Sequence, residues 1–160
     1  MASLSDLPLK YRVFVKAYPY RRVDWSPGSV LTKPLPETRV AVVTTAGLYR
    51  PTDTPFDDSI RGGDTSYRVI PYPIDLDTLQ IGHSSEAFDP SGIERDKNVA
   101  LPLDRLHDLA REHMVGSLAP RHFSFMGSIT APGRLISQTG PEVAAMLRAD
   151  GVEAVLLTPV

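Results

Sequence analysis

Apolar runs alternate with amphipathic segments along residues 39–160. A continuous apolar run at 39–44 predicts a buried strand, and further strands are expected at 67–72 and 116–120. Residues 101–115 carry apolar side chains at helical spacing, and the proline near their start suits the first turn of a helix. This alternation of strands and helices predicts an α/β domain with a mainly parallel sheet.

The segment 139–151 predicts the clearest helix. Thr139 offers an N-terminal cap, Arg148 suits the last turn, and Gly151 follows as a helix stop. The last ten residues, 151–160, form an apolar run that includes β-branched valines. We expect this run to be a buried strand that needs cover on both faces.

Residues 1–38 differ from the rest because they are rich in proline and aromatic side chains and lack a sustained period. We expect an irregular amino-terminal arm here, followed by one α/β domain at 39–160. The domain is predicted to have three layers, with a mainly parallel Rossmann-like sheet and helices on both faces. The arm is expected to pack through five aromatic residues: Tyr11, Phe14, Tyr18, Tyr20 and Trp25.

The composition is that of an ordinary globular protein, with 42% hydrophobic and 22% charged residues. A net charge of −2 and a pI near 6.1 give no reason to expect binding to nucleic acid or to an anionic membrane. No apolar stretch approaches the ~20 residues that span a bilayer, and the amino terminus lacks the apolar core of a signal peptide, so we expect a cytoplasmic location. The chain contains no cysteine, which excludes disulfides, thiolate metal sites and a cysteine nucleophile within it.

Polar residues cluster where the predicted parallel strands end, and such strand ends meet at one edge of a sheet. Thr44 and Thr45 could donate hydroxyl hydrogen bonds there, and Gly47 would let a ligand approach the backbone. The same "TTAG" sequence is equally typical of a simple turn after a strand. The residues expected at this edge are Thr44, Thr45, Gly47, Arg121, His122, Ser124 and Thr158. Among them, Arg121 and His122 would receive a substrate carboxylate, the first as a charged fork and the second as an acid.

A polar loop at 82–98 concentrates one histidine and several acids, namely His83, Glu86, Asp89, Glu94 and Asp96. These residues could bind a divalent metal or act as an acid–base set. Their spacing matches no tight metal signature, so the pattern favours solvated surface, and no metal is predicted. Asp64, in a second polar loop, is either a turn residue or part of the site.

Six blocks along the α/β domain follow the order that they have in one known family: "VAVVTTAGL", "GDTSYRVIP", His83, "RDKNVALPLDRL", "GSLAPRHFSFMG" and "DGVEAVLLTPV". On these blocks the chain resembles the selenoprotein B family, which holds the substrate-handling subunits of glycine, sarcosine, betaine and D-proline reductases. The resemblance implies a place in the site for His83, Asp89, Asp96 and Asn98, because similar sequences carry a comparable block.

The resemblance also implies a reaction, in which a selenolate or thiolate reductively cleaves a small amino-acid-like substrate and a dithiol/disulfide couple supplies the electrons. In the family, selenocysteine or cysteine follows the terminal strand. We therefore expect the nucleophile directly after Val160, where translation that stops at UGA would end the chain.

No cofactor is predicted, and the resemblance implies several partners. The expected partners are the substrate, other reductase subunits, a thiol reductant protein and the remaining copies of a homo- or hetero-oligomer. The alternative from another functional class is a non-catalytic α/β module that binds a small ligand or a partner subunit.

Overall fold

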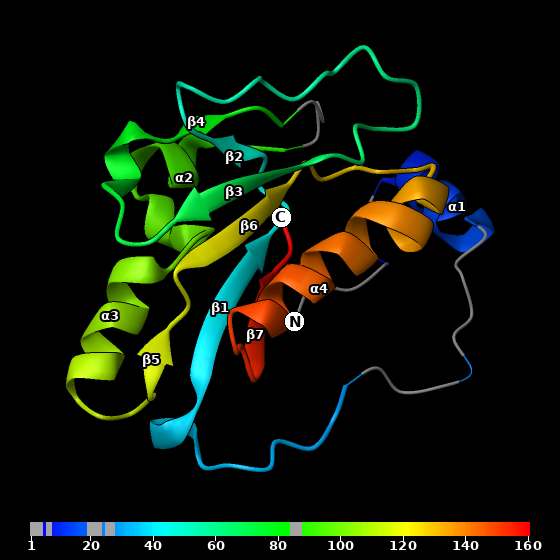
Figure 1. Cartoon of the computed structure of the whole chain (residues 1–160). Helices are drawn as coiled ribbons and strands as arrows, with labels where there is room; N and C mark the ends of the chain where they lie inside the picture. Colours follow the sequence, from blue (N-terminus) through cyan, green and yellow to red (C-terminus); the bar gives the residue numbers. More distant parts are fainter. Residues whose placement is uncertain (1–4, 6–7, 19–23, 25–27, 84–87) are drawn as a thin grey trace. The chain divides into compact units, whose positions relative to one another are not determined.

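The computed structural model describes residues 5, 8–18, 24, 28–83 and 88–160 (Figure 1). Contacts divide the chain into a small unit, Met1–Val30, and a larger unit, Leu31–Val160. The division expected between residues 38 and 39 falls inside the larger unit, just before its first strand.

The larger unit is the α/β part of the chain. Its strands are β1 (Arg39–Thr44), β2 (Leu48–Tyr49), β3 (Tyr67–Pro71), β4 (Gln80–Ile81), β5 (Ser117–Leu118), β6 (Arg121–Phe125) and β7 (Ala154–Thr158). Its helices are α2 (Ser91–Arg95), α3 (Leu103–Arg111) and α4 (Gly140–Ala149), with short helical turns η2 (Leu35–Glu37), η3 (Leu76–Thr78), η4 (Lys97–Val99) and η5 (Leu135–Thr139).

The main sheet is built around β1. Strand β7 pairs in parallel along the length of β1, while β5 and β6 pair in parallel with the two ends of its other side. Strand β3 adds an antiparallel edge beside β6, and β2 and β4 form a separate antiparallel pair. The prediction of a mainly parallel sheet is therefore confirmed.

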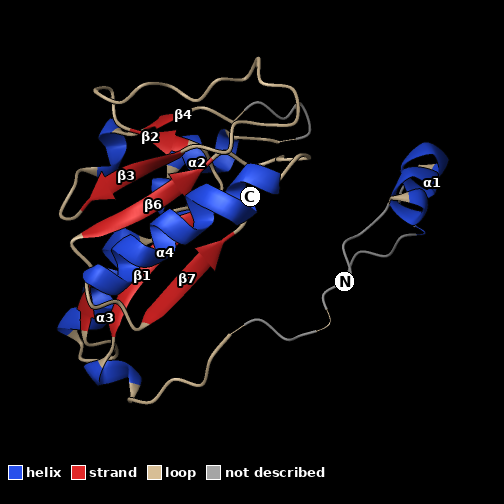
Figure 2. Cartoon of the chain, turned by 45° about the vertical axis from the view of Figure 1, so that its right-hand side comes forward, coloured by secondary structure: helices blue, strands red, loops and turns tan. Residues whose placement is uncertain are grey.

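Helices cover both faces of this sheet (Figure 2). On one face, buried side chains of α2 and α3, such as Ile93 and Leu106, pack with Val42 and Ile70. On the other face, α4 packs through Val143 and Leu147 against a second cluster that contains Phe123. The narrower expectation of a Rossmann-like arrangement remains a prediction.

A bulge interrupts the pairing between β1 and the β5–β6 segment. Leu118 lies opposite Val40 and Phe123 lies opposite Val43, so the β5–β6 segment advances five residues (118 to 123) while β1 advances three (40 to 43). The backbone N–H of Val42, in the interrupted part of the ladder, donates instead to Nδ1 of His122 at 2.9 Å. A side chain thus replaces a missing backbone acceptor in the middle of the sheet.

Two local predictions are wrong. The segment after residue 120 was expected to be a loop, but it forms β6, whose Phe123 and Phe125 pack in the cluster on the α4 face of the sheet. Thr139 was expected to cap the second helix, but η5 runs directly into α4 and no side-chain cap bond forms. The hydroxyl of Thr139 donates to the carbonyl oxygen of Thr65 at 2.8 Å and ties η5 to the loop before β3.

The terminal strand β7 was expected to be buried on both faces, and this too is wrong. Val155 and Leu156 are each 40% exposed and Leu157 is 68% exposed. The reason is topological, because β7 lies at the edge of the described sheet and only its β1 side is paired. On the side of α4, Val155 and Leu157 line an open apolar groove of about 400 Å³ together with Val143 and Leu147.

The amino-terminal unit contains a helix, α1 (Leu9–Ala17), where irregular structure was expected. Tyr11, Phe14 and Tyr18 are exposed in it, and the rings of Phe14 and Tyr18 lie 5.7 Å apart. Tyr20 and Trp25 lie outside the described residues.

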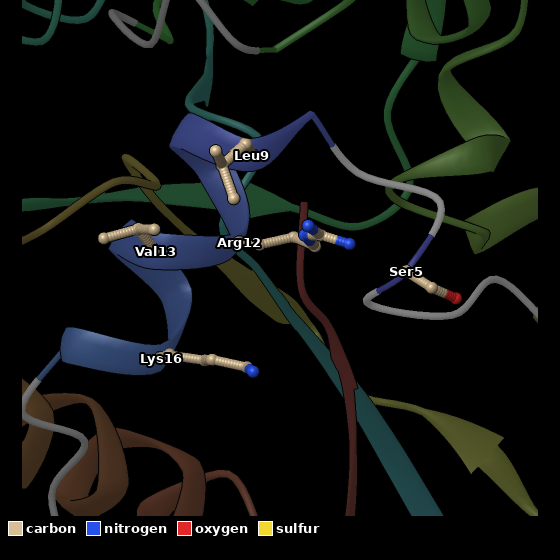
Figure 3. A pocket seen from close by; sticks show the side chains of 5 residues that line it. All are labelled: Ser5, Leu9, Arg12, Val13 and Lys16. Atoms are coloured by element: carbon tan, nitrogen blue, oxygen red, sulfur yellow. The ribbon is translucent and has the colours of Figure 1, made fainter.

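A shallow pocket on α1 is lined by Ser5, Leu9, Arg12, Val13 and Lys16, and in Figure 3 the Arg12 and Lys16 side chains extend in the same direction. Within the described parts of the chain, no helix is long and apolar enough to cross a membrane.

Candidate functional site at the carboxyl edge of the sheet

A row of four polar residues crosses the main sheet near the carboxyl ends of its parallel strands. Thr44 lies opposite Ser124 on one side and Thr158 on the other, and Ser124 also lies opposite Arg68 of β3. Residues that are paired across strands point to the same face, so these four side chains lie on the face covered by α2 and α3. The structure thus brings together three of the residues predicted at this edge.

Hydrogen bonds fix most of this row. Thr44 Oγ1 donates to the carbonyl oxygen of Thr158 at 3.3 Å and accepts from the N–H of Ala46 at 3.2 Å. Thr158 Oγ1 donates to the carbonyl oxygen of Ala100 at 2.7 Å. Ser124 differs, because its hydroxyl is fully buried and has no hydrogen-bond partner among the described residues. A buried hydroxyl without a partner is a candidate for binding a polar group.

Thr45 lies at the same edge and contacts the end of β7. Its hydroxyl accepts from the N–H of Val160 at 2.9 Å, and its backbone N–H donates to the carbonyl oxygen of Thr158 at 3.2 Å. The predicted role of Thr45 as a ligand donor remains a proposal. In the structure its hydroxyl holds the backbone beyond β7 against β1.

Gly47 has a positive φ of 66° that suits glycine. A Cβ at this position would lie 3.0 Å from the backbone of Gly82. The close approach predicted for a ligand is therefore made by the protein itself, because the N–H of Gly82 also donates to the carbonyl oxygen of Gly47 at 2.8 Å. This contact brings the segment after β4 to the carboxyl edge.

His83 follows directly in that segment. A Cβ at Gly127 would overlap its Nε2, so the imidazole lies against Gly127 in the loop after β6. Its ring also stacks near that of Phe88, with centroids 4.3 Å apart, and burial lowers the pKa of His83 below the ordinary 6.5. The expectation from the family resemblance that His83 belongs to the site remains a proposal.

Arg68 was not found from the sequence, although it extends the polar row. Its guanidinium donates to the carbonyl oxygens of Thr54 and Pro55 at 2.6 and 2.9 Å and lies 4.2 Å from the centre of the Phe56 ring. These contacts fully occupy it, so Arg68 holds the 54–66 loop against the sheet. An arginine within an alternating strand gave no signal that could distinguish this role from a solvated one.

Asp64 supports the same loop. Burial alone would raise its pKa, but the hydrogen bonds from Ser66 and Asp57 and the charge of Arg68 together hold the pKa of Asp64 below its ordinary value. Of the two interpretations open from the sequence, the structure places Asp64 in the turn.

Arg121 does not lie at the carboxyl edge. It begins β6, at the opposite end of the sheet, and its Nε and Nη2 donate to the two carboxylate oxygens of Asp150 at 2.6 and 3.0 Å. The expectation that it joins Thr44 and Thr158 is wrong because residues 121–125 are a strand rather than a strand-end loop.

His122 is fully buried beneath the helices and does not reach a surface. Burial lowers its pKa from 6.5 to about 4, so the imidazole is neutral at pH 7 and its expected role as an acid is unsupported. Nδ1 accepts from Val42, which places the proton of the neutral ring on Nε2. Nε2 has no hydrogen-bond partner among the described residues.

Two acidic residues of the 82–98 loop accept hydrogen bonds from backbone N–H groups two positions further along the chain. Asp89 accepts from the N–H of Ser91 at 3.0 Å, and Asp96 accepts from the N–H of Asn98 at 2.9 Å. The Asn98 side chain accepts from the N–H of Asp104 and donates to its carboxylate, which connects η4 to α3. Glu86 lies outside the described residues.

Among the residues that the structure describes, no three His, Asp or Glu side chains lie close enough together to hold a metal ion.

The fold is that of an α/β protein whose mainly parallel sheet carries a row of hydroxyl-bearing residues, a candidate site, at its carboxyl edge. The family model for glycine/sarcosine/betaine reductase selenoprotein B matches residues 8–160, and the chain belongs to this family. No solved structure matches it.

Several curated relatives are reductase subunits. D-proline reductase subunit gamma of Acetoanaerobium sticklandii is 36% identical over 84% of the chain and 52% of the relative. Sarcosine reductase complex component B subunit beta of Peptoclostridium acidaminophilum is 30% identical over 91% of the chain and 33% of the relative. Glycine reductase complex component B subunit gamma of Carboxydothermus hydrogenoformans is 30% identical over 94% of the chain and 34% of the relative. The chain thus spans about half to a third of the length of these relatives.

Proposed function

We propose that the chain is the substrate-handling part of a reductase that cleaves a small amino-acid-like compound of the glycine, sarcosine, betaine or D-proline type. The observation that carries the proposal is the unpartnered, buried hydroxyl of Ser124, set in the polar strand-end row of a chain that belongs to the selenoprotein B family. The relatives are subunits of reductase complexes, which supports other subunits as partners. We further propose that a thiol reductant protein is a partner of the chain and that the chain is cytoplasmic.

The proposed reaction needs a redox group that the 160 residues lack, because they contain no cysteine. We propose that a selenolate or thiolate supplied by another part of the protein attacks the substrate carbon that carries the nitrogen, so that a chalcogen–carbon bond forms while the C–N bond breaks and the amine leaves. A dithiol then attacks the chalcogen and becomes a disulfide; its two electrons and two protons give the C–H bond of the product and the regenerated selenol or thiol. In this proposal Ser124 and its neighbours bind and orient the substrate, while Thr44 and Thr45 hold β7 in place beside it.

The test compares two proteins made from the same gene. One is the 160-residue chain, and the other is the product of the complete reading frame, with any codon after Val160 that reads UGA replaced by a cysteine codon. We expect dithiol-dependent reduction of at least one of the four compounds by the second protein, combined with its partner subunits, and none by the first.

Replacement Ser124→Ala in the longer protein should lower kcat/KM by about ten- to a hundredfold, the effect of losing one well-placed hydrogen bond to a charged group. A stop codon other than UGA, or turnover by the 160-residue chain alone, would contradict the proposed origin of the redox group. Binding without turnover in the complete complex would favour the binding-module alternative.

A further inference from the structure

Helix α1 leaves its apolar side chains uncovered. None of the residues Leu9–Ala17, all of which the structure describes, is buried, and Leu9 and Val13 are 67% and 58% exposed. Isolated helices shorter than about 12–15 residues are marginal in water, so a helix of nine residues depends on the packing of an apolar face. A second surface that buries these side chains would supply that packing.

One face of α1 combines apolar and basic side chains. Leu9 and Val13 are four positions apart, and Arg12 and Lys16 follow each of them by three positions, so the four share a face. They are among the residues that line the shallow pocket on α1, where the two basic side chains extend in the same direction (Figure 3). The helix contains no acidic residue. A surface that complements this face would be apolar and belong to a negatively charged body.

The α4–β7 groove, formed by Val143, Leu147, Val155 and Leu157 among others, is an exposed apolar surface that suits a helix. Helix α4 packs on β1 and β6, and β7 lies beside them at the edge of the sheet (Figure 2). Packed helices lie about 8–10 Å apart, which is about two strand spacings, so the space over β7 fits one more helix beside α4. The lengths agree, because nine helical residues span about 14 Å and five strand residues about 17 Å.

The two surfaces belong to parts of the chain with opposite net charge. Residues 1–30 contain five Lys or Arg and two Asp, a net charge of +3, while the whole chain carries −2, so residues 31–160 carry −5. Like charges oppose contact between the 31–160 units of two copies. Unlike charges favour contact between that unit and the α1 of another copy.

We infer that α1 of one copy of the chain docks in the α4–β7 groove of a second copy. Leu9 and Val13 cover the exposed side chain of Leu157 in this interface. Arg12 and Lys16 stay at its rim, where the negative charge of the second copy favours them. The interface forms whether or not the chain takes part in a reductase, because it involves neither Ser124 nor a redox group.

The experiment measures the mass of the full 160-residue chain by analytical ultracentrifugation at tens of micromolar. We expect the wild type to associate, and Val13→Asp and Leu157→Asp each to weaken association about tenfold or more, because each places a carboxylate in an apolar contact. Valine and aspartate have similar helix propensities, so Val13→Asp does not act by unfolding α1. Far-ultraviolet circular dichroism checks that each variant is folded.

Two control variants make the same kind of change elsewhere. Val30→Asp lies in the same 1–30 unit as α1, and Met114→Asp lies in the same unit as the groove; both replace an exposed apolar side chain by an acid. Each should associate within about twofold of the wild type, as surface substitutions outside an interface do.

A mixture of the two interface variants separates this interface from contact between two β7 edges. Val13→Asp keeps an intact groove and Leu157→Asp keeps an intact α1, so their equimolar mixture should associate more strongly than either variant alone. Edge-to-edge contact of β7 predicts instead that Val13→Asp associates as the wild type does and that mixing adds nothing. A monomeric wild type, unchanged association of Val13→Asp, or a mixture no stronger than its components would each overturn the inference.

Discussion

The bond between Val42 and His122 makes the stability of the domain depend on pH in a defined window. Burial lowers the pKa of His122 from 6.5 to about 4, and the residue is fully buried. In the unfolded chain, His122 binds a proton once the pH falls below 6.5. In the folded chain, it binds one only when the pH falls to about 4. The free energy of unfolding therefore decreases as pH falls between these values, and the contribution of His122 is complete above pH 6.5.

The magnitude follows from the difference between the two pKa values. At ~1.4 kcal/mol per pKa unit the full loss is about 3 kcal/mol, and about 2 kcal/mol of it is reached by pH 5. That is a large part of the 5–15 kcal/mol that stabilises an ordinary domain, as a rough general range. Protonation would also abolish the acceptor at Nδ1 and leave the N–H of Val42 without a partner inside the sheet.

The assay is denaturant unfolding at a series of pH values from 7 to 4.5. His122→Asn keeps an oxygen acceptor near the position of Nδ1 and cannot titrate, so the difference in unfolding free energy between wild type and variant should shrink by about 2 kcal/mol between pH 7 and pH 5. His113→Asn is the control, because His113 is exposed and its φ of 57° suits asparagine. The reasoning would be refuted if His122→Asn kept the pH dependence of the wild type, or if His113→Asn lost it.

Two further predictions concern the ends of the strands. Arg121→Ala removes both hydrogen bonds to Asp150. Because the guanidinium is partly exposed, we expect the free energy of unfolding to fall by about 1 kcal/mol and the affinity for D-proline to stay unchanged. Weaker binding of D-proline in calorimetry would show that Arg121 belongs to the site after all. The exposed apolar strand β7 should make the 160-residue chain self-associate, so Leu157→Lys should shift light-scattering masses towards the monomer. A wild type that is monomeric at tens of micromolar would contradict the second prediction.

Much of the fold could be predicted from the sequence, because the spacing of apolar residues indicates which side chains of a helix or strand are buried. Strand β1 and helices α3 and α4 follow from apolar spacing and from proline and glycine at their ends. Strand β6 was missed because its arginine, histidine and serine resemble a polar loop. No local pattern shows that a histidine side chain will complete a backbone ladder, since that role depends on a bulge between residues 80 positions apart.

The residues of the candidate site, like the strands and helices, could be predicted only in part. Thr44 and Thr158 could be predicted, because the ends of parallel strands meet wherever the strands are recognised. Arg68 was missed, because its contacts with the carbonyl oxygens of Thr54 and Pro55 depend on how the 54–66 loop folds back on the sheet.

The central position of β1 has a consequence for how the chain reaches its native state. Arg39–Thr44 is synthesised before all of its partners, which are residues 117–124 and 154–158. Closing such long loops is entropically costly, and domains dominated by distant strand pairs fold slowly. During synthesis the central strand of the sheet therefore stays unpaired until residues 117–124 and 154–158 have been made. In that interval its unpaired edges are open to misassembly, so a chaperone that covers β1 would favour correct folding.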